Sequence, residues 1–180
     1  YSVTGVQTCA LPIFYFYEDK VEPLGYRFLI LEKVPGELIT DRISSFNEGQ
    51  IKDFLGNLAY MLGNLHSLRS KRYDSYYLDD KTTKKMAFGD YIMQEADFTL
   101  RGFADLKLDK DYQVDPHYLL KWCQGHKPLL QLDGYSMVHG DLRPSNIIVK
   151  GHKISGFIDW EMSCYSDPAS DLGWTLFFFK

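Results

Sequence analysis

Residues 137–160 read MVHGDLRPSNIIVKGHKISGFIDW, and the fold of the chain is inferred from this segment outward. Its apolar run 147–149 is short and rich in β-branched side chains, which predicts a strand and not a helix. A turn and a second strand over 154–158 would return along the first. The hairpin would bring Asp159 back beside the loop that carries Asp141 and Asn146. Two carboxylates and an amide gathered in one small volume suit a metal ion and phosphate groups.

The spacing of these residues resembles a known catalytic loop. The segment HGDLRPSN at 139–146 follows the pattern H-x-D-x-x-x-x-N of protein kinases, and Asp159 stands where those enzymes carry the aspartate of D-F-G. Gly140 replaces their arginine and Trp160 replaces their phenylalanine. In both respects the stretch resembles the aminoglycoside phosphotransferase and choline kinase family, the small-molecule branch of the kinase-like fold. The combined motif is specific, whereas either half alone would be weak.

This resemblance implies an α+β, protein-kinase-like fold. Residues 37–180 would form a mostly helical C-lobe with a catalytic-loop β-hairpin, and residues 14–36 would be the last strands and the hinge of an incomplete N-lobe. The implied activity is ATP-dependent transfer of the γ-phosphate to a hydroxyl of a small molecule, such as an aminoglycoside, choline or a similar metabolite. GTP is an alternative phosphate donor, and the identity of the acceptor stays open.

The resemblance also implies roles for individual residues. Asp141 would accept or orient the proton of the substrate hydroxyl, and Asn146 and Asp159 would hold Mg2+, which prefers oxygen ligands. Arg143 would either steady the transferring phosphoryl group as a planar donor or be an outward charge on the loop. His139 is expected to brace the loop and not to take part in the chemistry.

The N-terminal part predicts two strands that lead into a hinge. Residues 14–17 and 26–31 are rich in aromatic and aliphatic side chains, and the sequence EKVPG follows them. The resemblance places Glu32, Lys33 and Val34 in the hinge, whose backbone groups would bind the adenine edge. An edge hairpin that ends in a Pro-Gly turn is the alternative. The position upstream of the catalytic loop favours the hinge.

Helical spacing predicts a buried amphipathic helix over residues 47–68. Ser45 and Glu48 fit a capping box at its start. The apolar residues that recur at helical spacing are Ile51, Phe54, Leu55, Leu58, Leu62 and Leu65. His66 faces the same core, so we expect a hydrogen-bonded structural histidine. Asp171 lies in a segment similar to the family's D-P-x-x-D-L, which implies that it supports the catalytic loop by hydrogen bonding.

The region between these motifs predicts a loop and two further helices. Residues 71–85 are polar and read as the loop. An aromatic stretch follows, made of Phe88, Tyr91, Ile92, Phe98, Leu100 and Phe103. The resemblance implies that it helps to bind the substrate, and packing alone is an equal alternative. Asp115 and Pro116 predict a helix start, with a cap followed by a first-turn proline.

The composition describes an ordinary globular protein of 180 residues, with 45% hydrophobic and 24% charged residues. A net charge of −4 argues against a nucleic-acid binder with a broad basic surface. Cys9, Cys123 and Cys164 form no CxxC pair, which favours a reducing, cytoplasmic compartment. The uncharged residues 1–17 lack a basic leader and are short for a bilayer span, so no membrane is expected. The oligomeric state stays open.

The chain is expected to be a fragment with a foreign start. Residues 3–13, VTGVQTCALPI, match the conceptual translation of a common sequencing-library adapter, so residues 1–13 are left out of the fold. The sequence lacks a glycine-rich phosphate loop and the N-lobe lysine with its partner glutamate, and the C-terminal helices are expected to be missing. We therefore expect an inactive piece of an active kinase. A catalytically inactive kinase-like binding module and, less favoured, a metal-dependent phosphohydrolase are the alternatives.

Overall fold

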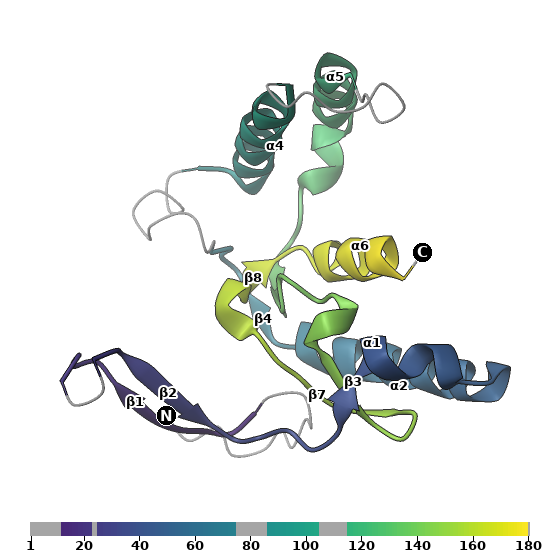
Figure 1. Ribbon diagram of the computed structural model, residues 1–180. Coiled ribbons are helices and arrows are strands. Elements are labelled where there is room, and N and C mark those ends of the chain that lie inside the picture. Colours follow the sequence, from purple (N-terminus) through teal and green to yellow (C-terminus); the bar gives the residue numbers. More distant parts are fainter. Residues whose placement is uncertain (1–11, 23–24, 75–85, 105–114, 180) are drawn as a thin grey trace.

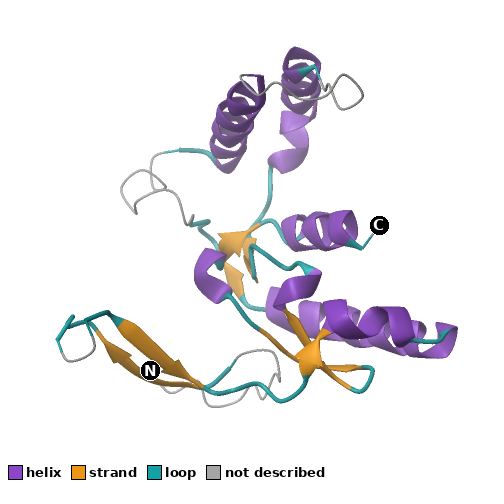
Figure 2. Cartoon of the chain, in the orientation of Figure 1, coloured by secondary structure: helices purple, strands orange, loops and turns teal. Residues whose placement is uncertain are grey.

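The structure is a computed structural model that describes residues 12–22, 25–74, 86–104 and 115–179 (Figure 1). Within these ranges, helices and strands are mixed, which confirms the α+β prediction (Figure 2). Most of the expected adapter segment and residues 75–85 of the expected polar loop lie outside the described ranges. None of the helices in the described ranges has the length and apolar character needed to cross a membrane.

The N-terminal strands form a two-stranded sheet of their own. β1 (Phe14–Glu18) pairs antiparallel with β2 (Phe28–Leu31), and Phe14 lies opposite Leu31. This confirms both predicted strands, although the second begins two residues later than the predicted range 26–31. In Figure 1 the sheet lies apart from the helices, and its aromatic and aliphatic side chains are largely exposed. It joins the rest of the chain through residues 32–36.

A second sheet contains the predicted catalytic-loop hairpin. β6 (Ile147–Lys150) pairs antiparallel with β7 (Lys153–Phe157), and β3 (Glu37–Leu38) adds to the free side of β6. Gly36 enters β3 with a φ of 132°, where an added Cβ would collide with the carbonyl oxygen of Val149. Only glycine combines this positive φ with so close an approach of two backbones. The end of the EKVPG segment is therefore fixed against β6.

The long helix predicted over 47–68 is α2 (Glu48–His66), but its predicted cap is wrong. Asn47 is the N-cap, and its side-chain oxygen accepts from the backbone N of Gln50 at 2.9 Å while Gln50 bonds back to Asn47 at 3.0 Å. Ser45 instead ends the 3-10 helix η1 (Ile43–Ser45), which follows α1 (Ile39–Arg42), and its hydroxyl donates to the carbonyl of Arg42 at 2.6 Å. The capping box is real and begins two residues later.

The main core forms where α2 packs against β6 and β7. The backbone N of Ile154 donates to Asn57 Oδ1 at 2.8 Å and ties β7 to the helix. Ile51 and Leu55, predicted to be buried, are 38% and 51% exposed, because they lie in the first turn and at the margin of the apolar stripe. Met61 is buried in the core in addition to the predicted residues. The buried cluster is Ile39, Phe54, Leu58, Met61, Leu62, Leu142, Ile147, Val149, Ile154 and Phe157.

A third sheet and the remaining helices complete the described fold. β5 (Tyr135–Val138) lies between β4 (Arg69–Ser70) and β8 (Cys164–Ser166), and both pairings are antiparallel. The short 3-10 helix η4 (Pro144–Asn146) ends the loop between β5 and β6, η5 (Trp160–Met162) follows β7, and α6 (Ala169–Phe178) follows β8. In Figure 1, α6 lies between α2 and the helix pair α4–α5.

The helix pair consists of α4 (Phe88–Ala104) and α5 (Pro116–His126), which continues into the 3-10 helix η3 (Lys127–Leu130). The predicted cap of α5 is confirmed, because Asp115 Oδ1 accepts from the backbone N of His117 at 2.9 Å. The aromatic stretch on α4 divides between two environments. Phe88 and Tyr91 are buried with Tyr73, whereas Phe98 is exposed.

Candidate active site

The loop at residues 139–146 contains a backbone turn that only glycine can adopt. β5 delivers the chain to His139, and β6 receives it after Asn146. Between them, Gly140 has a φ of 84°, and a Cβ at this position would collide with the carbonyl oxygen of Met162. Positive φ and a close backbone neighbour together leave room for glycine alone. This explains physically why the second position of HGD carries no side chain.

Helix α6 anchors the start of the loop through Asp171. One oxygen of its buried carboxylate accepts from the backbone N of His139 at 2.9 Å, and the other accepts from the backbone N of Gly140 at 3.0 Å. His66 Nε2 also lies 2.9 Å from Asp171 Oδ2. The expected roles of Asp171 as a loop support and of His66 as a structural histidine are confirmed. Thr175, one turn further along α6, donates its hydroxyl to the carbonyl of Leu142 at 2.8 Å.

His139 is fully buried and braces the loop from inside. The backbone N–H of Asp141 donates to Nδ1 at 3.3 Å, so Nε2 carries the proton that is donated to the carbonyl of Ile158 at 2.9 Å. Burial lowers the pKa of His139 below the usual value and outweighs the opposing effect of the Asp171 carboxylate. The ring is therefore neutral and links the loop to the end of β7.

Asp141 is the most heavily bonded side chain of the loop. Its Oδ2 accepts from Asn146 Nδ2 at 3.0 Å and is ion-paired with Arg143 Nε at 3.1 Å. Its Oδ1 accepts from Trp174 Nε1 at 2.7 Å. Two hydrogen bonds and an ion pair thus fix a carboxylate whose side chain is only 12% exposed. A carboxylate held in this way is ready to accept one more proton donor without rearranging.

The amide of Asn146 faces Asp141 with its nitrogen. Nδ2 donates to the backbone carbonyl of Asp141 at 2.9 Å as well as to its carboxylate, which uses both N–H groups. Within the described residues, no hydrogen bond engages Asn146 Oδ1. An amide oxygen of this kind is a suitable ligand for a hard cation.

Asp159 lies at the end of β7, beside Asn146. The backbone N of Ile158 donates to the backbone carbonyl of Asn146 at 3.0 Å, so the hairpin closes one residue before Asp159. Asp159 is exposed and adopts φ 67°, ψ 60°, a left-handed conformation that costs an aspartate free energy. The hairpin therefore brings the three predicted oxygen-bearing residues into one region. Their carboxylate and amide oxygens fit Mg2+, with the remaining positions left to water and phosphate.

The other predicted site residues lie in two places. Arg143 belongs to the loop, half-exposed, and is paired with Asp141. Glu32, Lys33 and Val34 lie between β2 and β3, where a hinge would be. The backbone N of Glu32 donates to the carbonyl of Ile13 at 2.7 Å, and this bond commits that N–H to the N-terminal segment.

Trp174 is the site residue that sequence reasoning missed. It follows Asp171 by three residues on α6, so both side chains lie on the face that meets the loop. The motif around Asp171 points to the aspartate alone. The signal in the sequence that indicates Trp174 is its i,i+3 spacing from Asp171 on the same helix.

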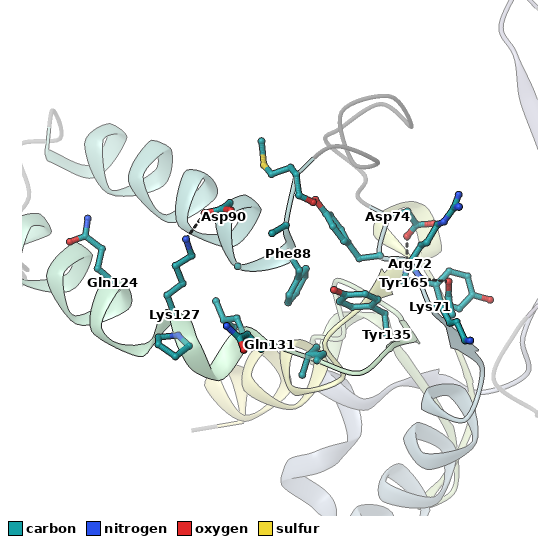
Figure 3. A pocket seen from close by; sticks show the side chains of 18 residues that line it. Lys71, Arg72, Asp74, Phe88, Asp90, Gln124, Lys127, Gln131, Tyr135 and Tyr165 are labelled. Atoms are coloured by element: carbon teal, nitrogen blue, oxygen red, sulfur yellow. Dashed lines mark hydrogen bonds and ion pairs between the residues drawn. The ribbon is translucent and has the colours of Figure 1, made fainter.

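A cavity of about 1120 Å3 lies elsewhere, between the start of α4, η3 and the third sheet. Figure 3 shows Phe88, Tyr135 and Tyr165 around it and the ion pair of Asp90 with Lys127 on one side. None of the predicted site residues lines this cavity. It includes Phe88 from the aromatic stretch, whose role in substrate binding stays a prediction.

Comparisons with known proteins support the kinase-like resemblance. The sequence model of the phosphotransferase enzyme family matches residues 5–180. No curated protein matches the chain. Solved structures do match it. An aminoglycoside-3'-phosphotransferase of type VIII is similar with a TM-score of 0.58 and 22% identity, over 94% of this chain and 58% of that one.

Two nucleotide complexes are also similar in structure. The GDP complex of aminoglycoside 2'-phosphotransferase-IIIa has a TM-score of 0.64 and 19% identity, over 96% of this chain and 57% of that one. ADP-bound aminoglycoside phosphotransferase APH(2'')-Ib has a TM-score of 0.60 and 17% identity, over 90% and 51%. At these identities the likeness concerns the fold, and it confirms the predicted protein-kinase-like architecture. The chain spans between half and three fifths of the length of these structures.

Proposed function

Because the chain belongs to the phosphotransferase enzyme family, we propose that its gene encodes an enzyme that transfers the γ-phosphate of ATP, or of GTP, to a hydroxyl of a small molecule. The observation that carries this proposal is the Asp141 carboxylate, fixed by two hydrogen bonds and an ion pair close to the end of β7. Phosphoryl transfer depends mainly on positioning and electrostatics, and a rigid acid beside oxygen ligands provides both.

In this proposal each residue of the loop has one task. Asp141 accepts the proton of the attacking hydroxyl, and Arg143 donates toward the transferring phosphoryl group with its terminal N–H groups while its Nε stays paired with Asp141 Oδ2. Asn146 Oδ1 and the carboxylate of Asp159 would hold Mg2+. When bound, Mg2+ offsets the negative charge that develops on the phosphate oxygens. His139 stays neutral and keeps the loop attached to β7.

Nucleotide binding is proposed at the segment between β2 and β3. Two structural neighbours hold ADP and GDP, respectively. By analogy, the adenine edge would meet backbone groups at Glu32, Lys33 and Val34, which lie between β2 and β3. The acceptor is proposed to be an aminoglycoside, choline or another hydroxylated metabolite, and the structural neighbours, which are aminoglycoside phosphotransferases, favour the first of these.

We further propose that the 180-residue chain itself is inactive. The sequence carries no glycine-rich loop or N-lobe lysine to hold the phosphates. On this proposal residues 1–13 are foreign, residues 14–36 are the remnant of an N-lobe, and residues 37–180 are a partial C-lobe in a cytoplasmic enzyme. ATP-dependent turnover of the 180-residue chain at ordinary rates would contradict this proposal.

The test is made on the product of the uninterrupted gene. Purified enzyme is screened with ATP and GTP against aminoglycosides, choline and other hydroxylated metabolites. Asp141→Ala should lower kcat by about 10²–10⁴-fold, the usual effect of removing a general base, while Mg2+–nucleotide binding is kept. Asp159→Ala should instead weaken Mg2+–nucleotide binding.

The outcomes also separate the alternatives. Nucleotide binding without any turnover in the unmutated enzyme would favour a catalytically inactive binding module. Release of phosphate that needs no ATP and survives Asp141→Ala would favour a phosphohydrolase. No structural observation favours the latter, since the described residues hold no cluster of three or more His, Cys, Asp or Glu side chains suited to a metal ion.

A further inference from the structure

A tryptophan from α6 donates directly to the proposed general base. Trp174 Nε1 lies 2.7 Å from Asp141 Oδ1, a length typical of hydrogen bonds to ionised oxygens. The indole is 43% exposed, although its N–H is engaged. The ring therefore lies at the open side of a carboxylate that is otherwise almost enclosed.

Counting acceptor positions shows which carboxylate oxygen can receive a substrate. A carboxylate oxygen has two lone pairs in its plane. Oδ2 of Asp141 accepts from Asn146 and is also ion-paired with Arg143, so two groups crowd this oxygen. Oδ1 accepts from Trp174 alone. The oxygen that Trp174 holds is therefore the less occupied one for an acceptor hydroxyl.

The helix that carries Trp174 is fixed to the loop on both sides of this bond. Asp171 binds the backbone at His139 and Gly140, and Thr175 binds the carbonyl of Leu142. Trp174 lies between these anchors in the sequence, so the backbone that carries its indole is held against the loop. An indole N–H also only donates, so it cannot compete with Asp141 for the proton of the substrate.

We propose that Trp174 is a positioning residue for phosphoryl transfer. Its N–H fixes the orientation of the Asp141 carboxylate so that Oδ1 faces the acceptor hydroxyl, and its exposed ring forms one side of the acceptor site. This inference rests on the proposed function, because it takes Asp141 as the general base. The hydrogen bond itself is independent of any activity, and the two are tested separately.

The hydrogen bond is tested by hydrogen exchange of indole N–H groups in the 15N-labelled product of the uninterrupted gene. Within the 180-residue chain there are three tryptophans to compare. Trp160 Nε1 donates to the carbonyl of Phe157 at 2.8 Å and is the bonded control, while Trp122 is exposed on α5. The Trp174 resonance is assigned by its loss in Trp174→Phe. We expect its N–H to exchange more slowly than that of Trp122 in the unmutated protein.

Asp141→Ala should then accelerate exchange at Trp174 by about 10-fold or more, the usual worth of a bond to a charged group, and leave Trp160 unchanged. Exchange at Trp174 as fast as at Trp122 in the unmutated protein would overturn the proposal without any variant. Unchanged exchange at Trp174 in Asp141→Ala would overturn it as well.

The kinetic test uses Trp174→Phe, which keeps an aromatic ring and removes the donor. We expect kcat to fall by about 10- to 100-fold, while the KM for ATP and the affinity for Mg2+–ADP stay within about twofold. Trp122→Phe is the matched control and should leave kcat unchanged. A merely structural role would lower the melting temperature and alter nucleotide affinity as well, and a kcat within about twofold of the parent would overturn the proposal. If the parent enzyme transfers no phosphate at all, the proposed function fails, whereas the exchange experiment still decides the hydrogen bond.

Discussion

At the scale of single residues, Gly140 is the position where the backbone of the loop tolerates least. Gly140→Ala must place a Cβ against the carbonyl oxygen of Met162 at a φ of 84°. The left-handed conformation alone costs about 1–2 kcal/mol, and relief of the collision should bring the loss of unfolding free energy to about 2–4 kcal/mol. Urea denaturation measures this loss.

The matched control for Gly140 is Gly56→Ala. Gly56 lies exposed on α2, and an added Cβ would meet no atom within 4 Å. Alanine is the better helix former, so this substitution should raise stability by about 0.5–1 kcal/mol. Equal effects of the two substitutions would show that Met162 yields and that the loop does not depend on glycine.

His139 makes stability depend on pH in a predictable direction. Burial lowers its native pKa, whereas the unfolded chain has the ordinary value of about 6.5. Below that value the unfolded state binds more protons, so the contribution of His139 is complete above about pH 6.5 and declines as the pH falls toward the lowered native value. The slope from this one group is at most about 1.4 kcal/mol per pH unit.

Urea denaturation is carried out on the parent and on His139→Gln between pH 5 and 8, a range of about three units around that pKa. The difference between the two proteins isolates the contribution of His139 to stability. The other histidines titrate in both proteins, so the difference between the two curves belongs to His139. We expect the parent to lose more stability than the variant as the pH falls. Parallel curves would mean that folding does not lower the pKa of His139.

The predictability of the site also differs between residues. Asp141, Asn146 and Asp159 were identified from sequence because a short hairpin brings them together, and the hairpin is encoded locally by two β-branched runs and a turn. Trp174 was not identified, because its contact with Asp141 depends on how α6 docks against the loop. That docking joins residues about thirty positions apart, and no local pattern encodes it.

At the scale of elements, the start of α2 shows how two neighbouring polar residues compete for one cap. Ser45 and Asn47 both suit an N-cap, and the sequence pattern alone favoured Ser45. The 3-10 helix η1 excludes Ser45 as the cap, because the hydroxyl of Ser45 donates to the carbonyl of Arg42 instead. Asn47 then makes a reciprocal pair of bonds with Gln50. Existence and period of the helix were predictable, whereas its first residue depended on the preceding turn.

This difference gives a test at the same scale. Asn47→Ala removes the acceptor for the Gln50 N–H and should lower stability by about 1 kcal/mol, the typical worth of an N-cap. Ser45→Ala removes a partly exposed bond outside α2 and should cost less than about 0.5 kcal/mol. Thermal unfolding of both variants decides between the caps. A larger loss for Ser45→Ala would restore the cap that the sequence first suggested.

At the scale of the whole molecule, the β1–β2 sheet behaves as a separate unit. Its side chains are mostly exposed, and within the described residues its extensive packing is between its own two strands, with the segment that ends at Gly36 leading to the core. Sequence patterns predicted both strands but not this isolation, because alternation and composition describe a strand without stating what covers it. A strand with so many exposed aromatic and aliphatic residues normally faces a partner surface.

Independence of the sheet leads to a prediction about the stability of the whole chain. Leu29 and Ile30 are 58% and 48% exposed on β2. Threonine is polar and, because it is β-branched, still favours a strand at both positions. The double substitution Leu29→Thr, Ile30→Thr should change the unfolding free energy of the core by less than about 0.5 kcal/mol. It should also reduce binding of the hydrophobic dye ANS.

Ile39→Ala is the contrast, since Ile39 is fully buried between α2 and the second sheet, and its loss should cost about 2–5 kcal/mol. Urea denaturation followed by circular dichroism measures the stability of the core, and ANS fluorescence measures the exposed apolar surface. If the threonine pair lowered the midpoint as much as Ile39→Ala, the N-terminal sheet would have to pack on the core, and the hinge segment could not be the sole connection between them.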